Sequence, residues 1–141
     1  GEPYTEAAAM SLAADHPGTV AVHIGFDEGL AHLIYAGSDA LAVPRRFEPC
    51  GLSQMIAMRY GTLPVVRATG GLRDTVDHGR TGFVFEQATA DAVAAAAAET
   101  LDAYGDQARW RPMMVEAMRQ DTTNARQNAL FVALFRSLHG S

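Results

Sequence analysis

An acidic motif, Arg46-Phe47-Glu48-Pro49-Cys50-Gly51-Leu52, lies between an apolar run and a helical pattern. The apolar run from Asp39 to Pro44 is typical of a buried strand, and Ser53 to Tyr60 is typical of a helix. Ligands of open α/β sheets bind outside the carboxyl ends of the strands. The free N–H groups at a helix start favour an anion, especially a phosphate. A carboxylate beside such a helix start therefore predicts chemistry on a phosphorylated substrate.

The composition is that of an ordinary globular protein. The 141 residues suffice for one domain with one core. The net charge of −5 and the scattered arginines argue against a nucleic-acid binder, which usually carries a basic stripe. The apolar runs are too short to span a bilayer, and no signal peptide is recognisable. The single Cys50 excludes an internal disulfide and is typical of a reducing compartment.

Strands and helices are predicted to alternate along the chain, which is typical of parallel βαβ units. The predicted strands are Thr19–Ile24, Ala40–Val43, Leu63–Val66 and Phe83–Phe85. The predicted helices are Tyr4–Ala14, Asp27–Ala36, Ser53–Tyr60, Gly70–Val76, Ala90–Tyr104, Gln107–Arg119 and Ala125–Leu138. We therefore expect a single partial α/β domain over residues 1–141, with helices and strands alternating over 1–86 and a helical tail over 87–141.

The acidic motif resembles the signature of the glycogen synthase and bacterial starch synthase family. The resemblance runs from Gly1 to about Leu138 and includes several further segments in the family's order. These segments are His23–Glu28, Ala36–Ala40, Tyr60–Val65, Thr69–Val76 and Thr81–Phe85. The resemblance implies a retaining two-domain glycosyltransferase of the GT-B type. It also implies that this chain carries part of the C-terminal, doubly wound Rossmann-like domain, which binds the nucleotide sugar.

The resemblance assigns Glu48 to the active site, near the donor sugar, where positive charge develops at the anomeric carbon. From its position alone, Glu48 is equally well explained as an acid in the first turn of a helix, facing the helix dipole. The same loop of the family holds the donor sugar and its distal phosphate. That role is thereby implied for Cys50, Gly51, Leu52 and Ser53.

Two further segments complete the implied donor site. Gly70 and Gly71 would line the donor phosphate or the acceptor channel, although a glycine pair before a helix is also a common turn. Ile24, Gly25 and Phe26 would bind the nucleotide base, with Phe26 offering a stacking face where the family usually carries Tyr. Without the resemblance, Phe26 would be interpreted as a core aromatic at a strand end. The histidines show no metal-ligand spacing, so we expect no metal and no cofactor beyond the nucleotide-sugar donor.

The implied reaction is transfer of glucose from ADP-glucose to the non-reducing end of an α-1,4-glucan, with retention. The implied partners are ADP-glucose or ADP and a glucan bound by a domain outside this chain, in the cytoplasm or, for a plant protein, in a plastid. One alternative is a related retaining glycosyltransferase with another acceptor, but those enzymes usually carry a second Glu near the position of Ile56. The other alternative is a non-catalytic nucleotide- or glucan-binding module.

The match to the family begins after the second strand of its doubly wound sheet. In the usual strand order, 3-2-1-4-5-6, the absent strands lie between Thr19–Ile24 and Ala40–Val43. We therefore expect a chain that is inactive alone and whose sheet has exposed edges. Such edges predict self-association. The alternative is a four-strand sheet in which Thr19–Ile24 pairs with Ala40–Val43.

Overall fold

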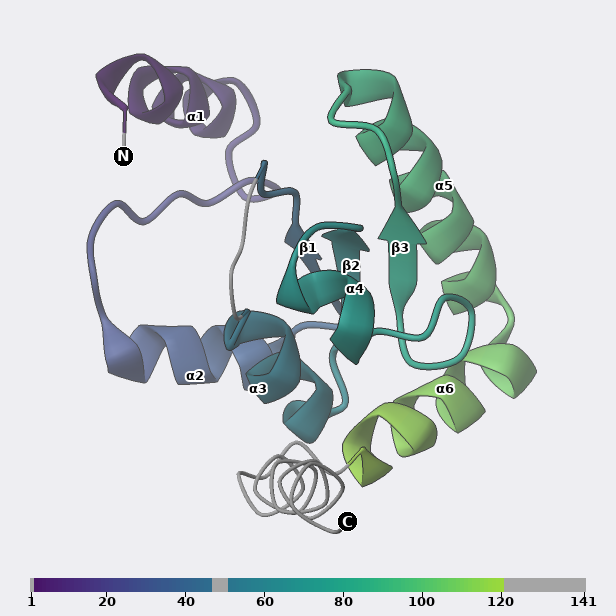
Figure 1. Ribbon diagram of the computed structural model, residues 1–141. Coiled ribbons are helices and arrows are strands. Elements are labelled where there is room, and N and C mark those ends of the chain that lie inside the picture. The colour runs from purple at the N-terminus through teal and green to yellow at the C-terminus, as the bar shows by residue number, and fades with distance from the viewer. Residues whose placement is uncertain (1, 47–50, 121–141) are drawn as a thin grey trace, which may run out of the picture. The chain divides into compact units, whose positions relative to one another are not determined.

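The computed structural model describes residues 2–46 and 51–120 (Figure 1). The chain divides into two compact units, Gly1–Ala31 and His32–Ser141, and each is described by itself. Within the described ranges, no helix has the length and hydropathy that a bilayer span requires.

The first unit contains helix α1, Pro3–Asp15, and the first residues of helix α2, Glu28–Gly37. α1 has proline in its first turn, where the missing N–H is not needed. α2 begins after Asp27, whose carboxylate accepts a hydrogen bond from the N–H of Leu30 at 2.9 Å. Asp27 therefore caps the start of this helix.

The segment between these helices corrects a prediction. Thr19–Ile24 was expected to form a strand, but it has no strand structure. A strand is held by ladder hydrogen bonds to a neighbour, and β-branched residues alone do not supply that neighbour. The alternative four-strand sheet, in which this segment pairs with Ala40–Val43, is therefore not formed in the described residues.

The second unit is built on a parallel sheet with the strand order β1-β2-β3. The strands are β1, Ala40–Val43, β2, Leu63–Arg67, and β3, Phe83–Phe85. In the register, Ala42 lies opposite Val65, and Val65 lies opposite Phe83. Residues 63–66 of the central strand form a continuous buried apolar run, as expected for a parallel strand that is covered on both faces.

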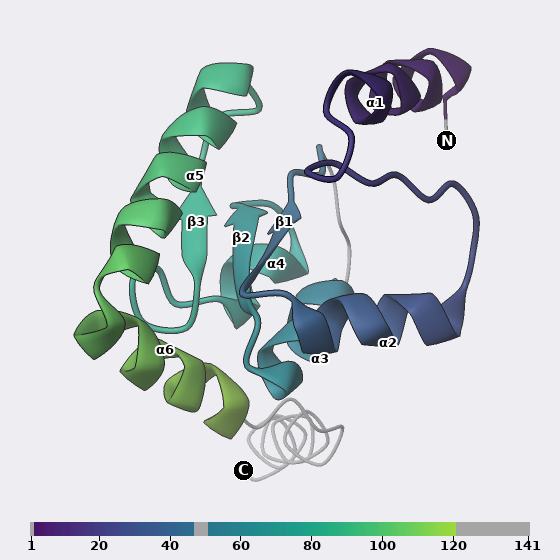
Figure 2. The ribbon, with the colours of Figure 1, turned by 180° about the vertical axis from the view of Figure 1, so that it is seen from behind.

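Helices cover both faces of this sheet. They are α3, Ser53–Tyr60, α4, Gly71–Thr75, α5, Ala90–Gly105, and α6, Gln107–Arg119. α4 lies in front of the sheet in Figure 1 and behind it in Figure 2, whereas α5 does the reverse. The predicted bounds of α3, α6, β1 and β3 are confirmed. The helix expected at Ala125–Leu138 lies outside the described residues.

Alternate residues of β2 belong to two cores. Val65 joins a large core that includes residues of β3, α3, α5 and α6, and Val66 joins a smaller core with Leu72 of α4. Trp110 of α6 is only 1% exposed and stacks on Phe83, with ring centroids 6.3 Å apart. Trp110 therefore serves packing of the larger core.

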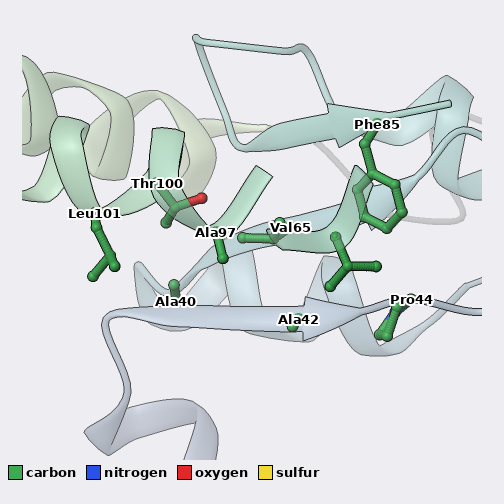
Figure 3. A pocket seen from close by; sticks show the side chains of 9 residues that line it. Ala40, Ala42, Pro44, Val65, Phe85, Ala97, Thr100 and Leu101 are labelled. Carbon is green, nitrogen blue, oxygen red and sulfur yellow. The ribbon is translucent and has the colours of Figure 1, made fainter. Parts of the chain in front are cut away.

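The edge of β1 that faces away from β2 has no strand partner in the described residues. Beside this edge lies an apolar groove of about 260 Å³, with Ala97 and Leu101 of α5 on one side and Ala40 and Ala42 of β1 on the other (Figure 3). The groove is completed by Pro44, Val65, Phe85, Val93 and Thr100. An open edge beside apolar surface is a ready template for another strand.

Candidate functional site

The two glycine turns that were predicted to hold the donor follow neighbouring strands. One turn ends at Gly51 and leads from β1 into α3, and the other, at Gly70 and Gly71, leads from β2 into α4. Because β1 and β2 are parallel neighbours, their carboxyl ends lie at the same edge of the sheet. Glu48 and Cys50 fall outside the described residues, so their roles stay predictions.

Both the backbone conformation and the space available for a side chain require glycine at position 51. Its φ is +61°, in the left-handed region that side chains other than glycine rarely adopt. A Cβ atom at this position would lie 2.5 Å from Nε2 and 2.6 Å from Oε1 of Gln54. The turn therefore brings bare backbone against the side chain of Gln54, and any substitution must displace it.

The N-terminus of α3 follows this turn directly. Leu52 occupies the N-cap position, and no side chain caps the helix start in the described structure. Leu52 is 67% exposed, and Ser53 is half-buried. Backbone N–H groups at an uncapped helix start carry the positive end of the helix dipole. This end of α3 thus has the chemistry of an anion-binding site.

Contacts on the inner side of α4 hold the second glycine turn in place. Gly70 has φ +48° and ψ −138°, and it is exposed, whereas Leu72 is buried in the smaller core. The hydroxyl of Thr75 donates to the carbonyl of Gly71 at 2.8 Å. The short helix α4 is therefore fixed on its inner side and leaves the glycine backbone facing outward.

One side-chain hydrogen bond connects the two turns. Nε2 of Gln54, in the first turn of α3, donates to Oγ1 of Thr75 in α4 at 3.0 Å. Sequence reasoning missed Gln54. In the sequence, the only indication of its role is that a polar residue stands next to the apolar positions Met55 and Ile56, in a helix that is expected to pack against the sheet.

Arg67, at the end of β2, was also missed as a site residue. Its Nε donates to the carbonyl of Arg45 at 2.9 Å, and its Nη2 donates to the carbonyl of Arg46. Arg67 thereby holds the backbone of Arg45 and Arg46, where the acidic motif begins, through its planar guanidinium group. In the sequence, the indication of this role is an arginine at the end of an otherwise apolar strand.

The residues predicted to bind the base lie in the first unit. Phe26 is 94% exposed, so its interpretation as a core aromatic is wrong. Ile24 is half-exposed, and Gly25 has φ +145°. The Phe26 ring is accessible for stacking, and its binding of a base stays a prediction.

The parallel sheet, the helices on both faces and the glycine turns at the carboxyl edge define a Rossmann-like domain of the GT-B type. The family profile of glycosyl transferases group 1 matches residues 6–114. The chain belongs to this family, and the predicted family and fold class are confirmed.

Three proteins illustrate the similarity. A glycogen synthase of Thermodesulfovibrio yellowstonii is 45% identical over 140 residues, which are 99% of this chain and 28% of that protein. The catalytic domain of starch synthase IV from Arabidopsis thaliana, solved bound to ADP and acarbose, matches with a TM-score of 0.82 and 30% identity, over 96% of this chain and 30% of that chain. Anabaena HepE, solved in complex with UDP, shares the fold at a TM-score of 0.72 and 20% identity, over 95% of this chain and 37% of its own.

The chain thus spans under a third of the length of the glycogen synthase and starch synthase it matches. Its likeness to both confirms a glycosyltransferase domain of the glycogen and starch synthase type. Residues outside this span contribute to the whole enzymes, so the donor, the acceptor and the complete reaction are treated below as proposals.

Replacing Arg67 tests whether it holds the loop after β1. In Arg67→Met, hydrogen exchange of the amides of Arg45 and Arg46 should accelerate. Stability in urea should fall by about 1 kcal/mol, a typical net value for a hydrogen bond. Arg67→Lys should not restore slow exchange, because one ammonium cannot reproduce the planar guanidinium fork. The exposed Arg119 serves as the matched control in Arg119→Met. Equal exchange in all four proteins would contradict the assignment.

Proposed function

We propose that the chain is the donor-binding part of a two-domain glucosyltransferase of the glycogen and starch synthase type. The reaction is transfer of glucose from ADP-glucose to the non-reducing end of an α-1,4-glucan, with retention. The observation that supports this function most strongly is the pair of glycine turns at one sheet edge, next to the uncapped start of α3. Such a surface suits the diphosphate of a nucleotide sugar.

The proposed roles combine the geometry of the second unit with the family resemblance of the acidic motif. The backbone of Gly51, Leu52 and Ser53 binds the distal phosphate and donor sugar together with Cys50. The turn at Gly70 and Gly71 lines the same phosphate. Glu48 stabilises positive charge at the anomeric carbon.

ADP-glucose is proposed as the donor because the starch synthase IV that this chain resembles was solved with ADP. The glucan acceptor would bind mainly to the part of the protein outside this chain. The proposal is supported by the 45% identity to a glycogen synthase across almost the entire chain. A cytoplasmic location also stays a prediction.

Two alternatives make different predictions for the same sample. A related glycosyltransferase with another acceptor would hydrolyse or transfer from a nucleotide sugar without elongating a glucan. A binding module would bind ADP and transfer nothing, even at full length. Measuring ADP affinity and glucosyl transfer on the intact protein separates the three cases. The 141-residue chain alone should transfer nothing, because the transition state needs groups from both domains.

In the intact protein, Glu48→Gln should retain donor binding and lower kcat by about 10²–10³-fold, the typical effect of removing a preorganised electrostatic group. Steady-state transfer to a maltooligosaccharide measures kcat. The matched control is Asp91→Asn, which alters an acid in the first turn of α5. Near-normal turnover of Glu48→Gln would show that Glu48 is only a helix-start acid.

Phe26→Ala in the intact protein should weaken ADP binding by about 1–3 kcal/mol, if its ring stacks on the base as aromatic rings do on nucleic-acid bases. Phe26→Tyr keeps the ring and should bind ADP about as well as the wild type. Tyr4, another aromatic residue that is 85% exposed, provides the control in Tyr4→Ala. Calorimetric titration with ADP gives the affinities, and equal values for all four proteins would remove Phe26 from the site.

We also infer that the chain taken alone associates with a second copy of itself. The open edge of β1 carries uncharged residues and adjoins the apolar groove, so two copies can pair these edges and cover both grooves. Unpaired backbone groups of an edge strand favour such pairing.

Light scattering over a range of concentrations tests this association. The wild-type chain should show a mass that rises with concentration, whereas Ala42→Lys, which places a charge at the edge and in the groove, should remain a monomer. Ala98→Lys adds the same charge at an exposed position of α5 outside the groove and should behave as the wild type does. A wild-type chain that is monomeric at every concentration would overturn the inference.

A further inference from the structure

Gln54 differs from the other buried polar residues of the described chain. Its side chain is completely buried. Of the other three, Thr62 bonds to Tyr35 or Ser38, Thr81 to Asp77, and Thr100 to Ala96. Oε1 of Gln54 is buried without any hydrogen-bond partner. An unsatisfied buried acceptor lowers stability, because it has lost its hydrogen bonds to water and gained none in the protein. Methionine has a similar shape and would fill the same space without that cost.

The position of the amide suggests why this cost is retained. On one side, the amide group lies against the backbone of Gly51, where no Cβ could fit. On the other side, its Nε2 donates to Oγ1 of Thr75, which donates in turn to the carbonyl of Gly71. A continuous path of contacts therefore runs from the first glycine turn to the second through Gln54.

The two ends of this path are the surfaces that the proposed function assigns to one phosphorylated donor. α3 and α4 belong to successive βα units, and α4 is only five residues long. The packing of α4 rests mainly on Leu72 in the smaller core. An apolar contact of this kind does not fix the orientation of the helix. A hydrogen bond is directional, and it can set the spacing and orientation of one turn relative to the other.

We propose that Gln54 is a positioning residue of the donor site. Through Thr75, its amide sets the separation of the Gly51 turn and the Gly70–Gly71 turn, so that both turns bind the same nucleotide sugar. The inference rests on the proposed function. Gln54 acts through the backbone of the turns.

The experiment uses five variants of the intact protein: Gln54→Met, Thr75→Val, the double variant, Thr75→Ser and Thr100→Val. Gln54→Met should unfold at the wild-type temperature or above, because the unpaired acceptor is gone. Its kcat/KM for ADP-glucose should nevertheless fall by about 10–100-fold, since a misplacement of about 1 Å can reduce a rate by 10². Its KM for the glucan should stay within about twofold, because the acceptor binds elsewhere.

Thr75→Val removes the hydroxyl that accepts the hydrogen bond from the Gln54 amide, and it should lower kcat/KM for ADP-glucose to a similar extent. The double variant should be no worse than either single variant, because both changes break the same connection. Thr75→Ser keeps the hydroxyl and should rescue activity. Thr100→Val is the matched control: it removes a buried threonine hydroxyl that bonds to a carbonyl four residues earlier, as Thr75 does, and should leave kcat/KM unchanged.

Three results would overturn the inference: wild-type kcat/KM in Gln54→Met, a loss of activity that parallels a loss of stability, or additive losses in the double variant. A wild-type protein that transfers no sugar would instead refute the proposed function. Amide exchange still tests the connection in that case. The amides of residues 69–72 should exchange faster in Gln54→Met than in the wild type, and equal exchange would refute the connection by itself.

Discussion

The parallel pairing of β1 with β2 is the interaction on which the candidate site depends. This pairing places the carboxyl ends of both strands at one edge, so turns that are separated by a helix in the sequence become neighbours. It also brings Arg67, the last residue of β2, within reach of the backbone that follows β1. Were the strands antiparallel, the two glycine turns would lie at opposite edges and could not serve one ligand.

The site combines rigid support with exposed backbone. Below the turns, the buried residues Leu72 and Val66 hold α4 to the sheet, and Ala57 and Met58 of α3 are buried. At the turns themselves, Gly51 and Gly70 both have positive φ angles that favour glycine; Gly70 is exposed, whereas Gly51 is buried against Gln54. Gln54 and Thr75 connect these layers with a directional hydrogen bond. This arrangement accepts one unsatisfied buried oxygen, and such local losses of stability are common where a binding surface must be held open.

The sequence predicted most elements of the second unit because their signals are local. β3 is bounded by Gly82, and α3 ends at Gly61, whose φ of +82° closes the helix in the left-handed region. The prediction failed at Thr19–Ile24, where β-branched residues favour a strand but no neighbour completes the ladder. Gln54 and Arg67 were missed for a related reason. Their roles depend on hydrogen bonds to residues 21 and 22 positions away, which no local pattern encodes. The glycine turns were found because they belong to motifs, whereas the residues that hold the turns together do not.

The central claim is that the two glycine turns bind the diphosphate of one nucleotide sugar. Hydrogen exchange of the intact protein with and without saturating ADP, read by mass spectrometry, tests this claim most directly. The account predicts slower exchange in peptides that contain residues 51–54 and residues 69–72 together, with little change in peptides from α5 and α6. Protection of only one turn, or protection confined to the groove between β1 and α5, would contradict it.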